Sequence, residues 1–129
     1  MKALLLSTLL LAASGSVFAH HQFASEFDAN KKVTLKGTVV KMAWVNPHAW
    51  LYIEVTEPDG TVVPWALEFG IPRTLIRQGW RKEDLPAGSI VTVEGYLAKN
   101  GTNSASASKV ILSDGRALFA GSSYVGDAK

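Results

Sequence analysis

Cysteine is absent from this 129-residue chain, which excludes a disulfide framework and any thiolate metal site. A charge imbalance is also lacking: without Lys2, which belongs to the leader below, twelve Lys and Arg face eleven Asp and Glu. This near-neutral balance gives no electrostatic basis for binding nucleic acid or an anionic membrane. Enzyme signatures are missing too, since no Gly-x-Ser-x-Gly, Walker loop or His-Glu-x-x-His sequence occurs. We therefore expect a protein that binds rather than catalyses.

A hydrophobic run long enough to cross a bilayer is also lacking. The apolar stretch Ala3–Ala13 follows Lys2 and is shorter than the roughly 20 residues a membrane-spanning helix needs. Val17-Phe18-Ala19 then places small residues at positions −3 and −1 of a cleavage site. We expect residues 1–19 to be a signal peptide cut after Ala19. The mature chain is then periplasmic, without a membrane anchor.

Most of the remaining chain has the two-residue alternation of β-strands with one buried face. We predict strands over residues 33–44, 51–56, 62–69, 90–98 and 106–112, with a short last strand at 117–119. Adjacent Val39-Val40 and the interior Gly37 indicate a bulge or a sharp curl in the middle of the first strand. Pro64 has no N–H to donate to a ladder and favours an edge position in the third strand.

One helix is expected, over residues 72–78. Pro72 stands at its first position and Gly79 just past its end, and Leu75 and Ile76 would form its inner face. The order β-β-β-α-β-β favours an all-β, five-stranded OB-like barrel, and the main competitor, an SH3-like barrel, lacks a helix at that place. We predict the following parts: signal peptide 1–19, N-terminal arm 20–32, barrel domain 33–119 and flexible tail 120–129.

The heptad Trp44–Trp50 interrupts the first two strands. Asn46-Pro47 is a turn signal, because proline fixes its own φ and moves the preceding residue out of the α region. We expect a bend that presents His48, with an indole on each side. In the arm, Phe23 and Phe27 have the spacing of one helical turn, while the Asp28-Ala29-Asn30 sequence favours a loop.

The histidines are the first candidate site. Cleavage after Ala19 makes His20 the first residue, so its α-amine and imidazole can chelate one metal ion together. His21 adjoins it, His48 lies at the bend, and Glu26 or Asp28 could add an oxygen ligand. Such nitrogen-rich donors favour Cu(II), then Zn(II) or Ni(II). The arrangement resembles the histidine brace of periplasmic copper carriers and copper oxygenases; the simpler alternative is that all three histidines are solvated or bonded to backbone.

Aromatic side chains are the second candidate site. An open barrel face could use them to bind a sugar, a peptide or a hydrophobic small molecule. The alternative is that Trp65 belongs to the core and the other indoles fill the ends of the barrel, because aromatic residues dominate core burial. The candidates for ligand binding are Trp44, Trp50, Tyr52 and Trp80.

Three groups of motifs carry a family resemblance. They are Ala19-His20-His21-x-Phe23 with Glu26-Phe27-Asp28, then Trp44-Val45-Asn46-Pro47-His48-Ala49-Trp50, and finally Glu68-Phe69-Gly70 with Gly79-Trp80-Arg81. Together they resemble a family of small exported proteobacterial proteins classed as a domain of unknown function. The resemblance implies a secreted β-domain with no evident cofactor, and it supplies no activity.

Our first expectation is a periplasmic, non-catalytic binding protein that holds copper through His20, His21 and His48. The alternative is an OB-type module that binds a small ligand, a peptide or a protein through its aromatic face, without metal. A third possibility is a small enzyme that uses brace-bound copper. Nucleic acid is not expected as a partner.

Overall fold

The computed structural model describes residues 23–121, and the predicted signal peptide, His20 and His21 lie outside that range. Six strands are present: β1 (Phe27–Ala43), β2 (Trp50–Thr56), β3 (Val62–Glu68), β4 (Ile90–Ala98), β5 (Ser104–Ile111) and β6 (Ala117–Phe119). One α-helix, α2 (Pro72–Arg77), and a 3-10 turn, Lys82–Asp84, lie between β3 and β4. Within the described part, no helix has the length and hydropathy to span a membrane.

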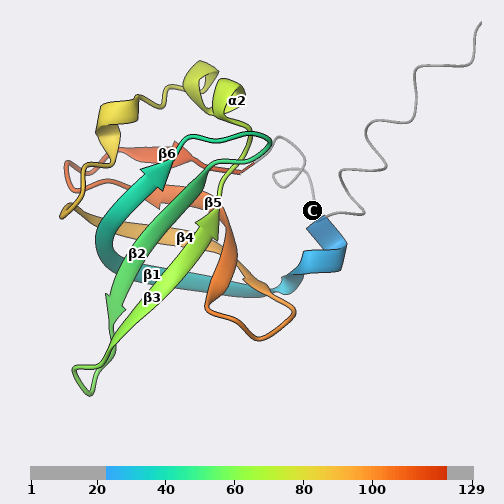
Figure 1. Cartoon of the computed structure of the whole chain (residues 1–129), viewed down its shortest axis with the longest axis vertical. Coiled ribbons are helices and arrows are strands. Elements are labelled where there is room, and N and C mark those ends of the chain that lie inside the picture. Colours follow the sequence, from blue (N-terminus) through green and yellow to red (C-terminus); the bar gives the residue numbers. More distant parts are fainter. Residues whose placement is uncertain (1–22, 122–129) are drawn as a thin grey trace, which may run out of the picture.

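The strands close into a ring. Their order in the sheet is β3-β2-β1-β4-β5-β6, and β3 also pairs with β5, which leaves β6 outside the ring (Figure 1). All pairings are antiparallel except β3 with β5. The predicted fold class, a mostly β domain with a ring of five strands and one short helix after the third, is confirmed.

The long strand β1 bends so that it can pair on both sides. It pairs with β4 through its first part and with β2 through its second, and the register shifts between Val39 and Lys41. The predicted bulge is therefore confirmed. Gly37 lies where the strands approach closely: a Cβ there would come within 2.6 Å of the Glu54 carbonyl oxygen, so a side chain does not fit.

The start of β1 differs from the sequence expectation of an arm followed by a strand from Val33. β1 begins at Phe27, which pairs with Ala98, and its register then shifts before Lys32. The turn-like residues Asp28 and Asn30 occupy this shift, where the Asp28 carboxylate accepts a hydrogen bond from the Asn30 N–H (2.9 Å). The local turn tendency is thus accommodated as an irregularity, because burial of Phe27 holds the chain on the sheet.

Pro64 lies on a free edge, as predicted. β3 pairs with β5 only over Ala66–Glu68, and the Ala66 N–H donates across that gap to the Asn103 carbonyl (3.1 Å). Because N–H groups alternate sides along a strand, the nitrogen of Pro64 faces the same side. No β5 residue pairs with it there, so the missing donor leaves no β5 hydrogen bond unmade.

The ring is filled by alternating apolar side chains, and the segment after β3 closes it. Leu75 of α2 is fully buried, whereas Ile76 is exposed, which corrects the expected inner pair: this six-residue helix buries one residue. Trp80 is 1% exposed, and its ring centroid lies 5.6 Å from that of Phe69. The largest fully buried side chains of the strands are Leu51, Ile53, Leu67, Val91, Val93 and Val110.

Candidate functional site

A row of neighbouring side chains crosses the outer face of the ring. Trp50 of β2 pairs with Glu68 of β3, Glu68 with Ser106 of β5, and Ser106 with Tyr96 of β4. Paired residues point to the same side of a sheet. The alternate positions Leu51, Leu67 and Ala105 are buried inside, so this row points outward.

Side chains on the outer face of a sheet are normally exposed to solvent, yet two side chains of this row are largely buried. Ser106 is 7% exposed and the Glu68 side chain 13%. The helical turn of residues 23–26, referred to below as the N-terminal turn, lies beside the row. Its Phe23 ring meets Tyr96 edge to face, with centroids 5.9 Å apart. The N-terminal turn therefore packs against the Tyr96 end of the row.

Lys99, just after β4, holds the N-terminal turn in place. Its backbone N–H donates to the Glu26 carbonyl (2.9 Å), and its Nζ donates to the Ala24 carbonyl. Phe27 adds an apolar anchor, since its ring is buried and lies 5.8 Å from that of Phe23. Two hydrogen bonds and this aromatic cluster therefore fix the N-terminal turn against the β4–β5 hairpin.

His48 is brought to the same place by the Asn46-Pro47 bend, whose peptide bond is cis. The residue after it, Ala49, exchanges backbone hydrogen bonds with the end of β3: its N–H donates to the Gly70 carbonyl (3.0 Å) and its carbonyl accepts from the Phe69 N–H (2.8 Å). The imidazole then reaches Glu68, with 2.6 Å between Nδ1 and Oε1. Among the described residues, Nε2 of His48 has no such partner.

The surroundings of Glu68 disfavour the charged form of its carboxyl group. Burial raises its pKa above the ordinary value of 4.5, the nearby Glu26 carboxylate raises it further, and His48 lowers it in part. The net direction is upward. One imidazole and two carboxylates therefore influence one another at this point of the surface.

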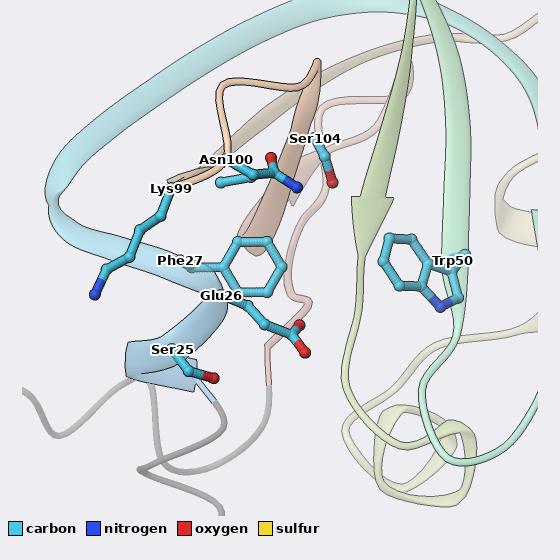
Figure 2. Close-up of a pocket in the computed structure, with 8 residues that line it drawn as sticks. Ser25, Glu26, Phe27, Trp50, Lys99, Asn100 and Ser104 are labelled. Atoms are coloured by element: carbon cyan, nitrogen blue, oxygen red, sulfur yellow. The ribbon is translucent and has the colours of Figure 1, made fainter.

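A cavity of about 540 Å³ opens beside the row. It lies between the N-terminal turn, the start of β2 and the β4–β5 hairpin, and we call it the groove (Figure 2). Phe27 and Trp50 stand on its two sides, with the Glu26 carboxylate between them in this view. The lining residues are Ser25, Glu26, Phe27, Trp50, Ala98, Lys99, Asn100 and Ser104.

The four aromatic residues expected to bind ligand are not together. Trp50 lines the groove, whereas Trp80 is buried and its Nε1 donates to the Phe119 carbonyl (2.8 Å). Trp44 is half-buried against the core. The Tyr52 ring faces Lys41, whose Nζ lies 5.1 Å from its centroid. One aromatic of the four therefore contributes to this cavity.

Of the three expected metal ligands, His48 is the one within the described range. Over residues 23–121, no three His, Cys, Asp or Glu side chains come close enough to hold a metal ion by themselves. A complete site would need donors from outside this range.

Sequence reasoning did not connect Glu68 with His48, although a signal was present. The Pro58-Asp59-Gly60 turn fixes the register of β2 and β3, and counting outward from it pairs Thr56 with Val62 and then Trp50 with Glu68. That register alone places Glu68 beside the end of the heptad. No comparable signal in the sequence pointed to the groove residues Lys99, Asn100 and Ser104. They line the groove only because the N-terminal turn lies next to them in the folded chain.

One family model matches the chain. It is DUF6152, described as a family of unknown function, and it covers residues 8–107. No curated protein and no solved structure matches.

Proposed function

Since the chain belongs to the DUF6152 family, whose function is unknown, we propose that it is an exported, non-catalytic metal-binding protein. Cu(II) is the preferred metal, and His20, His21 and His48 are its ligands. The proposal includes export to the periplasm with cleavage after Ala19, an OB-type barrel, and membership in a small exported group of proteobacterial proteins.

The observation that carries the proposal is the contact of His48 with Glu68. A histidine that ligates a metal usually donates its other ring N–H to a carboxylate, which fixes the tautomer and orients the ring. Here Nδ1 lies 2.6 Å from Glu68 Oε1, and the imidazole is 33% exposed. A proton on Nδ1 leaves the Nε2 lone pair available to a metal ion. Solvated histidines have no need of such a partly buried carboxylate.

Chain length supports the two remaining ligands. The described part of the chain starts in the N-terminal turn at Phe23, which touches Tyr96 in the same row as Glu68. His20 precedes Phe23 by three residues, and extended chain spans at most about 3.6 Å per residue. Covalent geometry therefore keeps the backbone of His20 within roughly 11 Å of that of Phe23, a distance that is compatible with a shared site.

The donor set determines the metal. An α-amine and up to three imidazoles are nitrogen ligands, for which Cu(II) leads the divalent affinity order. Glu68 offsets part of the added positive charge, and metal binding would release protons from the amine and the rings. The proposed role is binding or carriage of the metal, since no enzyme motif was found in the sequence.

A Cu(II) titration tests the proposal. We expect protein that starts at His20 to bind at least tenfold more tightly than a form with one extra residue before His20, because the extra residue removes the α-amine from the chelate. His48→Ala should weaken binding, and Glu68→Gln should do so by about 10- to 100-fold, as a change to the carboxylate behind a ligand does.

Glu57→Gln, at an exposed carboxylate of the β2–β3 hairpin, is the matched control and should bind as the unmodified chain does. Mass spectrometry of protein isolated from the periplasm should give the mass of a chain whose first residue is His20. Equal, weak affinity in the two N-terminal forms would contradict the proposal.

The groove supports a second candidate function. A cavity of about 540 Å³ with an aromatic wall falls within the range of small-molecule sites, so the chain would be an OB-type ligand-binding module with incidental histidines. The metal content of protein isolated from the periplasm separates the two candidates: stoichiometric copper favours the first, and its absence the second.

A further inference from the structure

The groove has a chemistry of its own, and we propose that it binds a small organic ammonium ion with an apolar body. Its lining does not include any of the three histidines, so the site can be tested without metal. It is formed by the N-terminal turn, Trp50 and the β4–β5 hairpin.

Two aromatic side chains give the groove its apolar walls. Phe27 is 4% exposed and is backed by Phe23, so its ring is held in position. Trp50 is half-buried and stands on the other side (Figure 2). A flat or aliphatic ligand body placed against Trp50 would bury apolar surface there, and the indole face attracts cations. Phe27 is already buried and backs the other side of the groove.

The Glu26 carboxylate is the charged group that faces the two rings. Glu26 extends between the two rings in Figure 2, and it forms no ion pair with any side chain of residues 23–121. The nearest lining cation, Lys99, donates its Nζ to the Ala24 carbonyl and points away from Trp50 in the same view. Glu68, which does not line the groove, lies close enough to act electrostatically on Glu26.

The polar groups suit an ammonium head. Such a head has three donors to satisfy, and the lining includes the Glu26 carboxylate and the Ser104 hydroxyl. The Asn100 amide oxygen already accepts two hydrogen bonds from Thr102, so it is not among the acceptors left for the head. An anion would instead meet the Glu26 carboxylate, and a bare metal ion would find only that carboxylate where it needs several donors.

The size of the groove limits the occupant to a single small molecule. A volume of about 540 Å³ lies in the middle of the 300–1,000 Å³ typical of such sites. An arylalkylamine with one ring and a two-carbon spacer can place its ring against Trp50 and its nitrogen at Glu26. Phenethylamine is therefore the probe.

The first experiment is a titration of phenethylamine into metal-free protein in the presence of EDTA, followed by NMR. We expect saturable binding and a shift of the Trp50 indole N–H resonance, with little change at the buried Trp80. The neutral analogue 2-phenylethanol and the anion phenylacetate should bind at least tenfold more weakly, since each lacks the charge that Glu26 recognises. Equal binding of all three would overturn the proposal, and so would no saturable binding.

Substitutions at Glu26 and Trp50 test whether phenethylamine binds in the groove. Glu26→Gln keeps the size of an exposed side chain and removes its charge, so the fold should be retained while the affinity for phenethylamine falls about tenfold or more. Trp50→Leu should lower affinity as well. Glu57→Gln is the matched control and should change nothing. Equal effects of Glu26→Gln and Glu57→Gln would show that the attraction is only nonspecific. Because EDTA is present throughout, failure here leaves the copper proposal standing, and the reverse also holds.

Discussion

Trp80 and Trp50 lie on opposite sides of the same short stretch of sheet. Inside, Trp80 packs against Phe69, and its indole N–H is bonded to the Phe119 carbonyl. Outside, Trp50 pairs with Glu68, the residue before Phe69, and remains half-buried beside a cavity. The two indoles were equal candidates for binding in the sequence. They differ in burial: Trp80 is almost completely buried by the fold, whereas Trp50 keeps part of its surface accessible.

The comparison extends to the residues around each indole. The inner side is apolar and its polar atom is satisfied, which is how buried groups normally contribute stability. On the outer side, a carboxylate has a raised pKa, Glu26 has no ion-pair partner among residues 23–121, and an imidazole nitrogen of His48 stays available. Groups left partly unsatisfied on a rigid support are candidates for binding.

Trp80→Ala should have the largest effect on stability. Loss of a fully buried indole leaves a cavity and an unpaired Phe119 carbonyl, and we expect the free energy of unfolding to fall by about 3–5 kcal/mol. Urea denaturation measures this change. A loss below about 1 kcal/mol would mean that Trp80 contributes little to stability. It would contradict the contrast drawn between Trp80 and Trp50.

Trp80→Phe should have a smaller effect and separates the two contributions of the inner indole. Phenylalanine keeps most of the packing against Phe69 but cannot donate to Phe119. We expect a loss of about 1–3 kcal/mol, which combines one buried hydrogen bond with the missing ring volume. If this variant were as unstable as Trp80→Ala, packing against Phe69 would contribute little.

Trp50→Ala should cost less again, about 1 kcal/mol, because the outer indole is already half exposed. The same variant should lose the response to phenethylamine. Urea denaturation and the amine titration, performed on one preparation, give both values. A stability loss as large as that of Trp80→Ala would place Trp50 in the core instead.

Glu68 should give the smallest effect, a dependence of stability on pH. Since its pKa is raised in the folded state, the folded chain holds the proton more strongly than the unfolded chain. Its contribution is therefore fully present below 4.5 and is lost as pH rises through the raised pKa. Urea denaturation between about pH 4 and 6 should show a smaller decline for Glu68→Gln than for the unmodified chain. Equal declines in the two proteins would show that Glu68 does not make stability depend on pH. Glu57→Gln again serves as the control.

Local patterns predicted the frame of this molecule well. Alternation, the Pro58–Gly60 turn and the placement of Pro72 and Gly79 each act within a few residues, so they can be read without knowing the fold. The bulge after Val39 and the edge position of Pro64 follow from the same local physics.

The site depends on contacts that no local pattern contains. Phe23 was compatible with a helical turn or a loop, and its contact with Tyr96 decides where the N-terminal turn lies. Glu68 is largely buried, although the residue alternates as an outer position should. The groove exists because Lys99 ties two distant segments together. Its lining could not be predicted before the fold was known.

The free edge of β3 has a consequence for how these molecules behave at high concentration. An exposed strand edge is a template on which another chain can add a strand, and such addition begins aggregation. Here the donor missing at Pro64 interrupts the row of N–H groups where β5 has turned away. A second molecule approaching this edge meets a gap in the ladder and a pyrrolidine ring in its path. The residue that marks the edge therefore also keeps neighbouring copies apart.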